Sequence, residues 1–165
     1  NQLYGLVVRA AKITASVIFL VAAAMVSAWL ITAADIPSYV SAMLEPFIAT
    51  PILLMFVLMI LVIIVGTALD MAPTILILTP VLMPAIREAG INPVYFGILF
   101  VMNNALGMVT PPVGTVLNVA ASVSRISVDD AFKGVFPFLL AEIIVMLVLV
   151  LFPDLVLVPL RFLMH

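Results

Sequence analysis

Long apolar runs separated by short polar stretches dominate the pattern of this chain. Residues 13–34 and 134–152 are almost unbroken apolar runs. At a helical rise of about 1.5 Å per residue, each is long enough to cross most or all of a hydrocarbon core of about 30 Å. The stretch 35–47 differs, because apolar residues such as Ile36 and Tyr39 recur there at helical spacing among polar ones. The pattern predicts two plain membrane-spanning helices and a short amphipathic helix along the membrane surface.

Two further apolar segments lie between the plain helices, and glycine, proline and polar residues interrupt both. The first, 51–86, contains GTALDMAP around Asp70, and the second, 94–124, contains GMVTPPVG around Thr110. A pair of apolar segments interrupted in this way indicates a binding site in secondary transporters. The sequence therefore predicts an all-α integral membrane protein in which some helices are discontinuous.

Composition strengthens the membrane assignment and excludes several classes of function. Hydrophobic residues make up 67% of the chain and charged residues 8%, with a mean hydropathy of +1.45, whereas soluble domains are about half apolar and a quarter charged. The chain has no cysteine for a disulfide or thiol catalyst, and its net charge of −2 offers no basic face for nucleic acid. No nucleophile is paired with a base, so we expect neither an enzyme nor a bound cofactor. The chain opens without a signal-peptide layout, and we expect it to be part of a larger protein.

The prolines at the second interruption deprive main-chain oxygens of their donors. Pro111 and Pro112 have no N–H, so the carbonyls of Gly107 and Met108 lose the partners that a helix would give them. Thr110 precedes a proline and is disfavoured in helical geometry, which frees further carbonyls. We therefore expect several carbonyl oxygens to converge on a short unwound loop, the arrangement that coordinates Na⁺ in secondary transporters.

The first interruption follows the same chemistry and adds a charge. Pro73 frees the carbonyl of Leu69, and Asp70 is the only ionisable residue between Glu45 and Arg87. A carboxylate inside a membrane segment is a candidate functional group. Among free carbonyls it completes an all-oxygen neighbourhood that suits a hard cation.

Simpler interpretations of these residues remain open at this point. Asp70 could cap a helix at the membrane surface if the preceding helix spans the bilayer, and Asn103 and Asn118 could only join neighbouring helices. However, Asn103 and Gly107 are four residues apart, as are Gly114 and Asn118. Polar and small positions therefore share one helix face on each side of the interruption.

Three stretches resemble a known family: GTALDMAPTILILTPVLMPAI, GINPVYFGILFVMNNALGMVTPPVGTVLNVAA and VFPFLLAEIIVMLVLVLFPDLVLVPL. They are similar to the C-terminal half of the large membrane subunit of tripartite ATP-independent periplasmic (TRAP) transporters, and the resemblance extends from about Lys12 onward. The family belongs to a wider group of elevator-type ion transporters. The inverted first half of such a subunit is absent from this sequence.

The resemblance implies half of an inverted-repeat elevator fold, with a re-entrant helical hairpin and an unwound helix. It divides the chain into a scaffold transmembrane helix with a surface arm (1–50), half of a transport domain (51–133, with the hairpin at 51–86 and the broken helix at 94–125), and a C-terminal transmembrane helix with a tail (134–165). Counting positive charges does not separate this hairpin from a single kinked pass, because either arrangement puts four of the six Lys and Arg residues inside.

The resemblance also implies the site residues. A Na⁺ site would be formed, mostly through backbone carbonyls, by Gly66, Thr67, Asp70, Met108, Val109, Thr110 and Pro111. We place Asn103, Gly114 and Asn118 on the substrate side of that site.

The expected function is Na⁺-coupled uptake of small organic anions, such as dicarboxylates or sugar acids, across a bacterial inner membrane. The implied partners are a small membrane subunit and a periplasmic substrate-binding protein. Two alternatives remain: a proton-coupled transporter in which Asp70 carries the proton, and a membrane subunit that anchors a partner without transporting.

Overall fold

The computed structural model describes residues 2–163, and every regular element in that part of the chain is an α-helix. The predicted all-α class is therefore confirmed. Four of these helices, α1, α3, α4 and α7, are long and apolar enough to cross a membrane. In chain order the helices are α1 (Gln2–Ala33), α2 (Ile36–Ile48), α3 (Pro51–Ala68), α4 (Met71–Glu88), α5 (Pro93–Val109), α6 (Thr115–Ser124), α7 (Val128–Leu151) and α8 (Asp154–Leu163).

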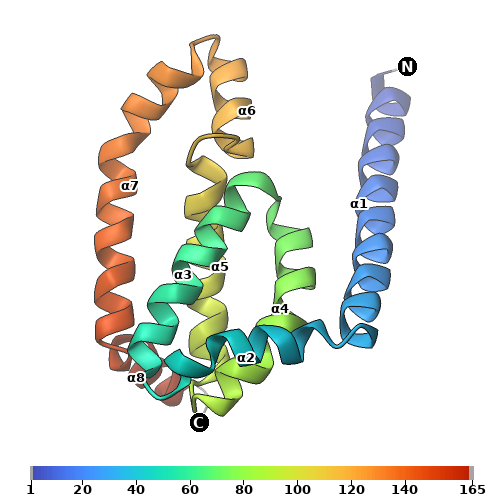
Figure 1. The fold of residues 1–165 in the computed structure, drawn as a ribbon. Helices are drawn as coiled ribbons and strands as arrows, with labels where there is room; N and C mark the ends of the chain where they lie inside the picture. The colour runs from blue at the N-terminus through green and yellow to red at the C-terminus, as the bar shows by residue number, and fades with distance from the viewer. Residues whose placement is uncertain (1, 164–165) are drawn as a thin grey trace.

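Figure 1 shows how the helices are arranged. The rod α1 stands at one side and α7 at the other, and α2 runs across the lower end of the molecule. Helices α3 and α4 run in opposite directions and form a helical hairpin, whose tip lies below the upper ends of α1, α6 and α7. Helix α5 rises behind the hairpin, and α6 continues upward after a short break. The tip of the hairpin and the break in α5–α6 therefore lie at similar depth in the molecule.

The core lies between the hairpin and α5. Leu58 and Val62 of α3, Leu82 of α4, and Phe96 and Leu99 of α5 are buried there. Helix α7 adds the buried side chains of Leu139, Met146 and Val150 to the same cluster. In a membrane, where lipid is as apolar as these side chains, van der Waals packing across this contact is what holds the hairpin against α5.

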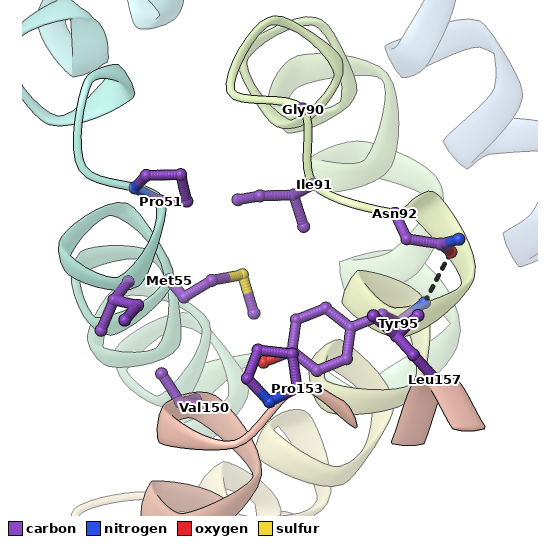
Figure 2. Close-up of a pocket in the computed structure, with 10 residues that line it drawn as sticks. Pro51, Met55, Gly90, Ile91, Asn92, Tyr95, Val150, Pro153 and Leu157 are labelled. Atoms are coloured by element: carbon purple, nitrogen blue, oxygen red, sulfur yellow. Dashed lines mark hydrogen bonds between the residues drawn. The ribbon is translucent and has the colours of Figure 1, made fainter. Parts of the chain in front are cut away.

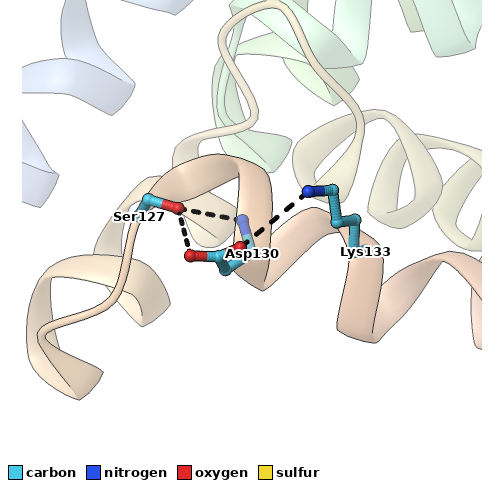
Figure 3. A network of polar contacts seen from close by, with 3 residues as sticks. All are labelled: Ser127, Asp130 and Lys133. Atoms are coloured by element: carbon cyan, nitrogen blue, oxygen red, sulfur yellow. Dashed lines mark hydrogen bonds and ion pairs between the residues drawn. The ribbon is translucent and has the colours of Figure 1, made fainter.

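Helix α7 begins earlier than the sequence pattern suggested. We predicted a helix from residue 134, where the apolar run starts, but α7 begins at Val128. Ser127 is the N-cap, and its hydroxyl accepts a hydrogen bond from the Asp130 amide at 3.1 Å and donates one to the Asp130 carboxylate at 2.7 Å (Figure 3). Lys133 lies 4.0 Å from the same carboxylate and is exposed. A polar cap and acidic residues in the first turn start the helix before its apolar part.

The ends of the chain are also more helical than the pattern suggested. The predicted run 13–34 corresponds to α1, which ends at Ala33, one residue before the end of the run, and extends back to Gln2. The tail contains α8, an amphipathic helix without buried residues. The predicted surface helix at 35–47 corresponds to α2, whose bounds differ by one residue at each end.

Candidate functional site: the hairpin tip and the broken helix

The tip of the hairpin is a two-residue link with exposed main-chain oxygens. Leu69 and Asp70 are both extended, and Asp70 is the N-cap of α4, although its carboxylate makes no capping hydrogen bond. The Asp70 carbonyl accepts hydrogen bonds from the Thr74 amide at 3.2 Å and the Thr74 hydroxyl at 2.8 Å. Within the described residues, the carbonyls of Gly66, Ala68 and Leu69 have no donor. The Asp70 carboxylate therefore stands beside unpaired carbonyls, as expected from Pro73.

The break between α5 and α6 covers residues 110–114. Thr110 has φ −99° and ψ 132°, which confirms that the residue before the two prolines leaves helical geometry. The carbonyls of Met108, Val109 and Thr110 lack a donor in the part of the chain that the structure describes. The expectation for Gly107 was wrong, because its carbonyl accepts the Thr110 amide at 3.0 Å in a tighter turn.

The structure brings these two interruptions into direct contact. The amide of Gly114 donates a hydrogen bond to the Thr67 carbonyl at 3.2 Å and so ties the loop to the hairpin tip. Below it, α3 and α5 cross at two glycines: a Cβ added to Gly107 would lie 2.8 Å from the Cα of Gly66 and 2.8 Å from the Ile63 carbonyl oxygen. Only glycine permits this approach of two backbones. Residues 66–70 and 107–114 therefore lie in contact and form one candidate site.

An open cavity of about 420 Å³ lies beside this site. Its lining residues are Asp70, Met108, Thr115, Val116, Val119, Ala120 and Val123. The structure thus brings Asp70 of the hairpin and Met108 of the broken helix to the same cavity. The lining is apolar apart from Asp70 and Thr115, and it contains no lysine, arginine or histidine.

The first turns of two helices border the cavity with unpaired amide groups. Helix α6 starts after Gly114, which has the left-handed φ of 49°. The amides of Thr115, Val116 and Leu117 have no acceptor among the described residues, as expected for a helix N-terminus without a side-chain cap. The amides of Met71 and Ala72 at the start of α4 are in the same situation. Both helix ends therefore present partial positive charge near Asp70.

Two of the predicted substrate-side residues make contacts that hold the fold together. The Asn118 amide donates to the Val113 carbonyl and closes the loop onto α6. The Asn103 amide donates to the Met59 carbonyl of α3. Asn103 lines a separate cavity between α3, α5 and α7, and does not line the one beside Asp70. A direct contact of Asn103 or Asn118 with substrate stays a prediction.

Our sequence reasoning missed two polar residues at this site. Asn104 is 0% exposed and Thr115 is half-buried, and neither the side-chain oxygen of Thr115 nor either amide atom of Asn104 has a hydrogen-bond partner. The sequence signal was the Asn103–Asn104 pair inside an apolar helix, which places one amide on each of two adjacent faces of α5.

A second well-formed cavity lies at the opposite end of the hairpin. Figure 2 shows this space of about 180 Å³, into which Met55, Ile91 and Tyr95 point. The Tyr95 hydroxyl donates to the Leu149 carbonyl at 2.9 Å. The Asn92 side chain accepts from the Val94 and Tyr95 amides at 2.9 and 3.2 Å and caps α5. This cavity lies between the base of the hairpin and α8, and no charged residue lines it.

Comparisons with known proteins identify related sequences. Residues 1–155 match the family model described as the DctM component of the tripartite ATP-independent periplasmic transporter. The chain is 50% identical, over 96% of its length, to the 2,3-diketo-L-gulonate TRAP transporter large permease protein YiaN of Escherichia coli, and it spans 37% of that protein. It is 48% identical, over 98% of its length, to a TRAP transporter large permease of Haemophilus influenzae, of which it spans 38%. The C4-dicarboxylate permease DctM of Pseudomonas aeruginosa is 29% identical over 86% of the chain, which spans 33% of it. No solved structure matches the chain.

Proposed function

The chain belongs to the DctM family of tripartite ATP-independent periplasmic transporters, and from this membership we propose that it forms half of a Na⁺-coupled carrier for small carboxylate anions. Its relatives are permeases, so it is a transporter component and not an enzyme. Because the chain spans little more than a third of the curated relatives, the proposal concerns a larger protein in which this part supplies one wall of the site.

One observation carries the proposal: the Gly114–Thr67 hydrogen bond joins two helix interruptions whose carbonyls lack donors. Each such oxygen costs several kcal/mol in hydrocarbon unless protein, water or an ion satisfies it. The available ligands are carbonyl oxygens and the Asp70 carboxylate, which suit a hard cation. Among the described residues no group of three His, Cys, Asp or Glu could hold a metal ion, so the donor set favours an alkali cation over a transition metal.

The same site supports an anionic substrate. The N-termini of α4 and α6 present unpaired amides near the cavity beside Asp70, and helix N-termini favour negative charge. The relatives' names specify diketogulonate and C4-dicarboxylate, both of which carry carboxylate groups. Because the lining of the cavity offers no basic side chain, bound Na⁺ would offset the charge of Asp70 and allow a carboxylate to approach.

Coupling follows from this arrangement. Without the cation, the Asp70 carboxylate repels the anion and the free carbonyls face it. With the cation bound, both effects are reduced, so each ligand raises the affinity for the other. The tip of the hairpin lies below the ends of α1 and α7 in Figure 1, which supports a re-entrant hairpin that carries the site as part of a moving elevator domain. The assembly would act in a bacterial inner membrane with a small membrane subunit and a periplasmic binding protein.

Replacement of Asp70 by asparagine tests the proposal in the assembled transporter. We expect Asp70→Asn to insert normally and to lose Na⁺-dependent uptake, measured in proteoliposomes at fixed pH. The control is Asp154→Asn, which removes an exposed carboxylate at the start of α8, away from the site. Uptake by Asp70→Asn with wild-type Na⁺ dependence would contradict the assignment. Uptake by the wild type that follows pH and ignores Na⁺ would favour the proton-coupled alternative, and lack of any uptake would favour an anchor subunit.

A further inference from the structure

Asn104 is the most fully enclosed polar side chain without a partner in the described part of the chain. It is 0% exposed, and both its amide oxygen and its amide nitrogen lack hydrogen-bond partners. Its neighbour Asn103 is equally buried but donates to the Met59 carbonyl. A buried amide without a partner costs about 1–3 kcal/mol. The fold therefore provides a hydrogen-bond partner for the side chain of Asn103 but none for that of Asn104.

The amide oxygen of Asn104 is directed at the last turn of α3. A Cβ added to Gly66 would lie 2.5 Å from Asn104 Oδ1 and 3.1 Å from the Asn104 carbonyl oxygen. The carbonyl of Gly66 itself has no donor within the described residues. Asn104 also lies one helical turn before Met108, on the side of α5 that leads to the cavity beside Asp70. An unpaired side-chain oxygen thus lies against Gly66, whose own carbonyl is unpaired.

Enclosure limits what can satisfy this amide. Because this chain alone covers Asn104 completely, a side chain from another subunit or from a missing segment does not reach it without displacing α3 or α5. The partner is therefore a species of the size of a water molecule or a small cation. A carboxamide oxygen is a good ligand for hard cations, and it stands among carbonyl oxygens of the same character.

We propose that Asn104 is a further ligand of the coupling cation, acting through Oδ1 from the α5 side, opposite Gly66 on the hairpin. This inference rests on the proposed Na⁺ site and adds Asn104 to the ligands that the family resemblance implied. A cation held between Asn104 and the hairpin connects α3 to α5, so its binding stabilises the contact between the tip and the loop.

The test compares leucine variants of the two asparagines in the purified, assembled transporter. Thermal unfolding is followed while NaCl replaces choline chloride at constant ionic strength. Asn104→Leu removes an unsatisfied polar group, so we expect its stability without Na⁺ to match or exceed that of the wild type. The NaCl concentration for half-maximal stabilisation should rise about tenfold or more, the scale of losing one group at a metal site.

Asn103→Leu serves as the matched control, because it removes a satisfied amide one residue away. We expect it to lower the stability without Na⁺ and to leave the half-maximal NaCl concentration unchanged. Asn104→Asp retains a side-chain oxygen of the same reach, and we expect it to respond to Na⁺ at concentrations no higher than the wild type requires.

The outcomes separate this inference from the proposed function. If the wild type and Asn103→Leu are stabilised by Na⁺ and Asn104→Leu responds at the same concentrations, Asn104 binds only a water molecule and the inference is wrong while the Na⁺ site stands. If the wild type shows no Na⁺ response, the proposed Na⁺ coupling fails, and the assignment of Asn104 fails with it.

Discussion

Helices α3 and α5 cross at Gly66 and Gly107, and their backbones touch there. We therefore predict that Gly107→Ala lowers the stability of the protein. In Gly107→Ala, the new methyl carbon would lie 2.8 Å from the Gly66 Cα and carbonyl carbon and 2.8 Å from the Ile63 carbonyl oxygen. All three atoms are main chain, so no side chain can rotate away. The two helices must separate until these contacts reach about 3.4 Å, where ordinary van der Waals contact begins.

The magnitude follows from two opposing terms. Overpacking of this kind costs about 1–3 kcal/mol, whereas alanine gains about 1 kcal/mol over glycine inside a helix. The difference is a net loss of up to about 2 kcal/mol for Gly107→Ala. Gly97 provides the control, because it lies in the same helix and a Cβ there would meet nothing within 4 Å. Gly97→Ala should therefore be neutral or stabilising by up to about 1 kcal/mol.

Thermal unfolding of the two variants in detergent, with and without Na⁺, measures both effects. Because the separation of α3 from α5 also displaces Thr67 from Gly114, Gly107→Ala should require more Na⁺ for half-maximal stabilisation than Gly97→Ala. A Gly107→Ala variant that is as stable as Gly97→Ala and responds equally to Na⁺ would refute the close crossing.

Two other substitutions test the loop and a part of the fold remote from it. Gly114→Ala places a side chain at φ +49° and 3.1 Å from the Thr110 carbonyl oxygen, so we expect a loss of about 1–2 kcal/mol and faster proteolysis at the loop; wild-type resistance would contradict the loop geometry. Ser127→Ala removes the N-cap of α7 and should lower the free energy of unfolding by about 1 kcal/mol without altering the response to Na⁺, and an altered Na⁺ response would show that α7 is coupled to the site.

The sequence predicted the interruptions because proline chemistry is local. Pro73 lies at the start of α4, and Pro111 and Pro112 lie in the break between α5 and α6. However, proline alone did not define a break, since Pro80 and Pro84 lie inside α4. At the second interruption the additional signal was the pair of consecutive prolines between Gly107 and Gly114, and at the first it was Asp70, three residues before Pro73.

Contacts between distant segments were less accessible from the sequence. The family resemblance implied Gly66 as a site residue, but its contact with Asn104 and Gly107 depends on how α3 packs against α5, and no local pattern specifies that packing. The Thr110 amide donates a hydrogen bond to the Gly107 carbonyl because the helix ends in a tighter turn. The absence of an N–H group in Pro111 does not reveal that turn. Asn104 was overlooked because helical spacing drew attention to Asn103, which shares a face with Gly107.

The depth of the unpaired carbonyls constrains what surrounds them. Eight main-chain oxygens at the two interruptions lack donors among the described residues: those of Gly66, Ala68, Leu69, Met108, Val109, Thr110, Pro111 and Pro112. At several kcal/mol each in hydrocarbon, their combined cost would exceed the net stability of about 5–15 kcal/mol that a typical domain retains. The site therefore cannot face lipid, whereas the exposed apolar side chains of α1 and α7 can.

Water could satisfy the same oxygens one by one, but the contact between tip and loop favours a shared ligand. If separate water molecules satisfied the carbonyls of each interruption, the two interruptions would not need to touch. The hydrogen bond from Gly114 to Thr67 and the close approach of Gly66 to Gly107 would then have no role at the site. The contact places main-chain oxygens from both interruptions and the Asn104 amide in one region. A single cation there would satisfy groups from both sides at once, so removing it should loosen the tip from the loop before it affects the rest of the core.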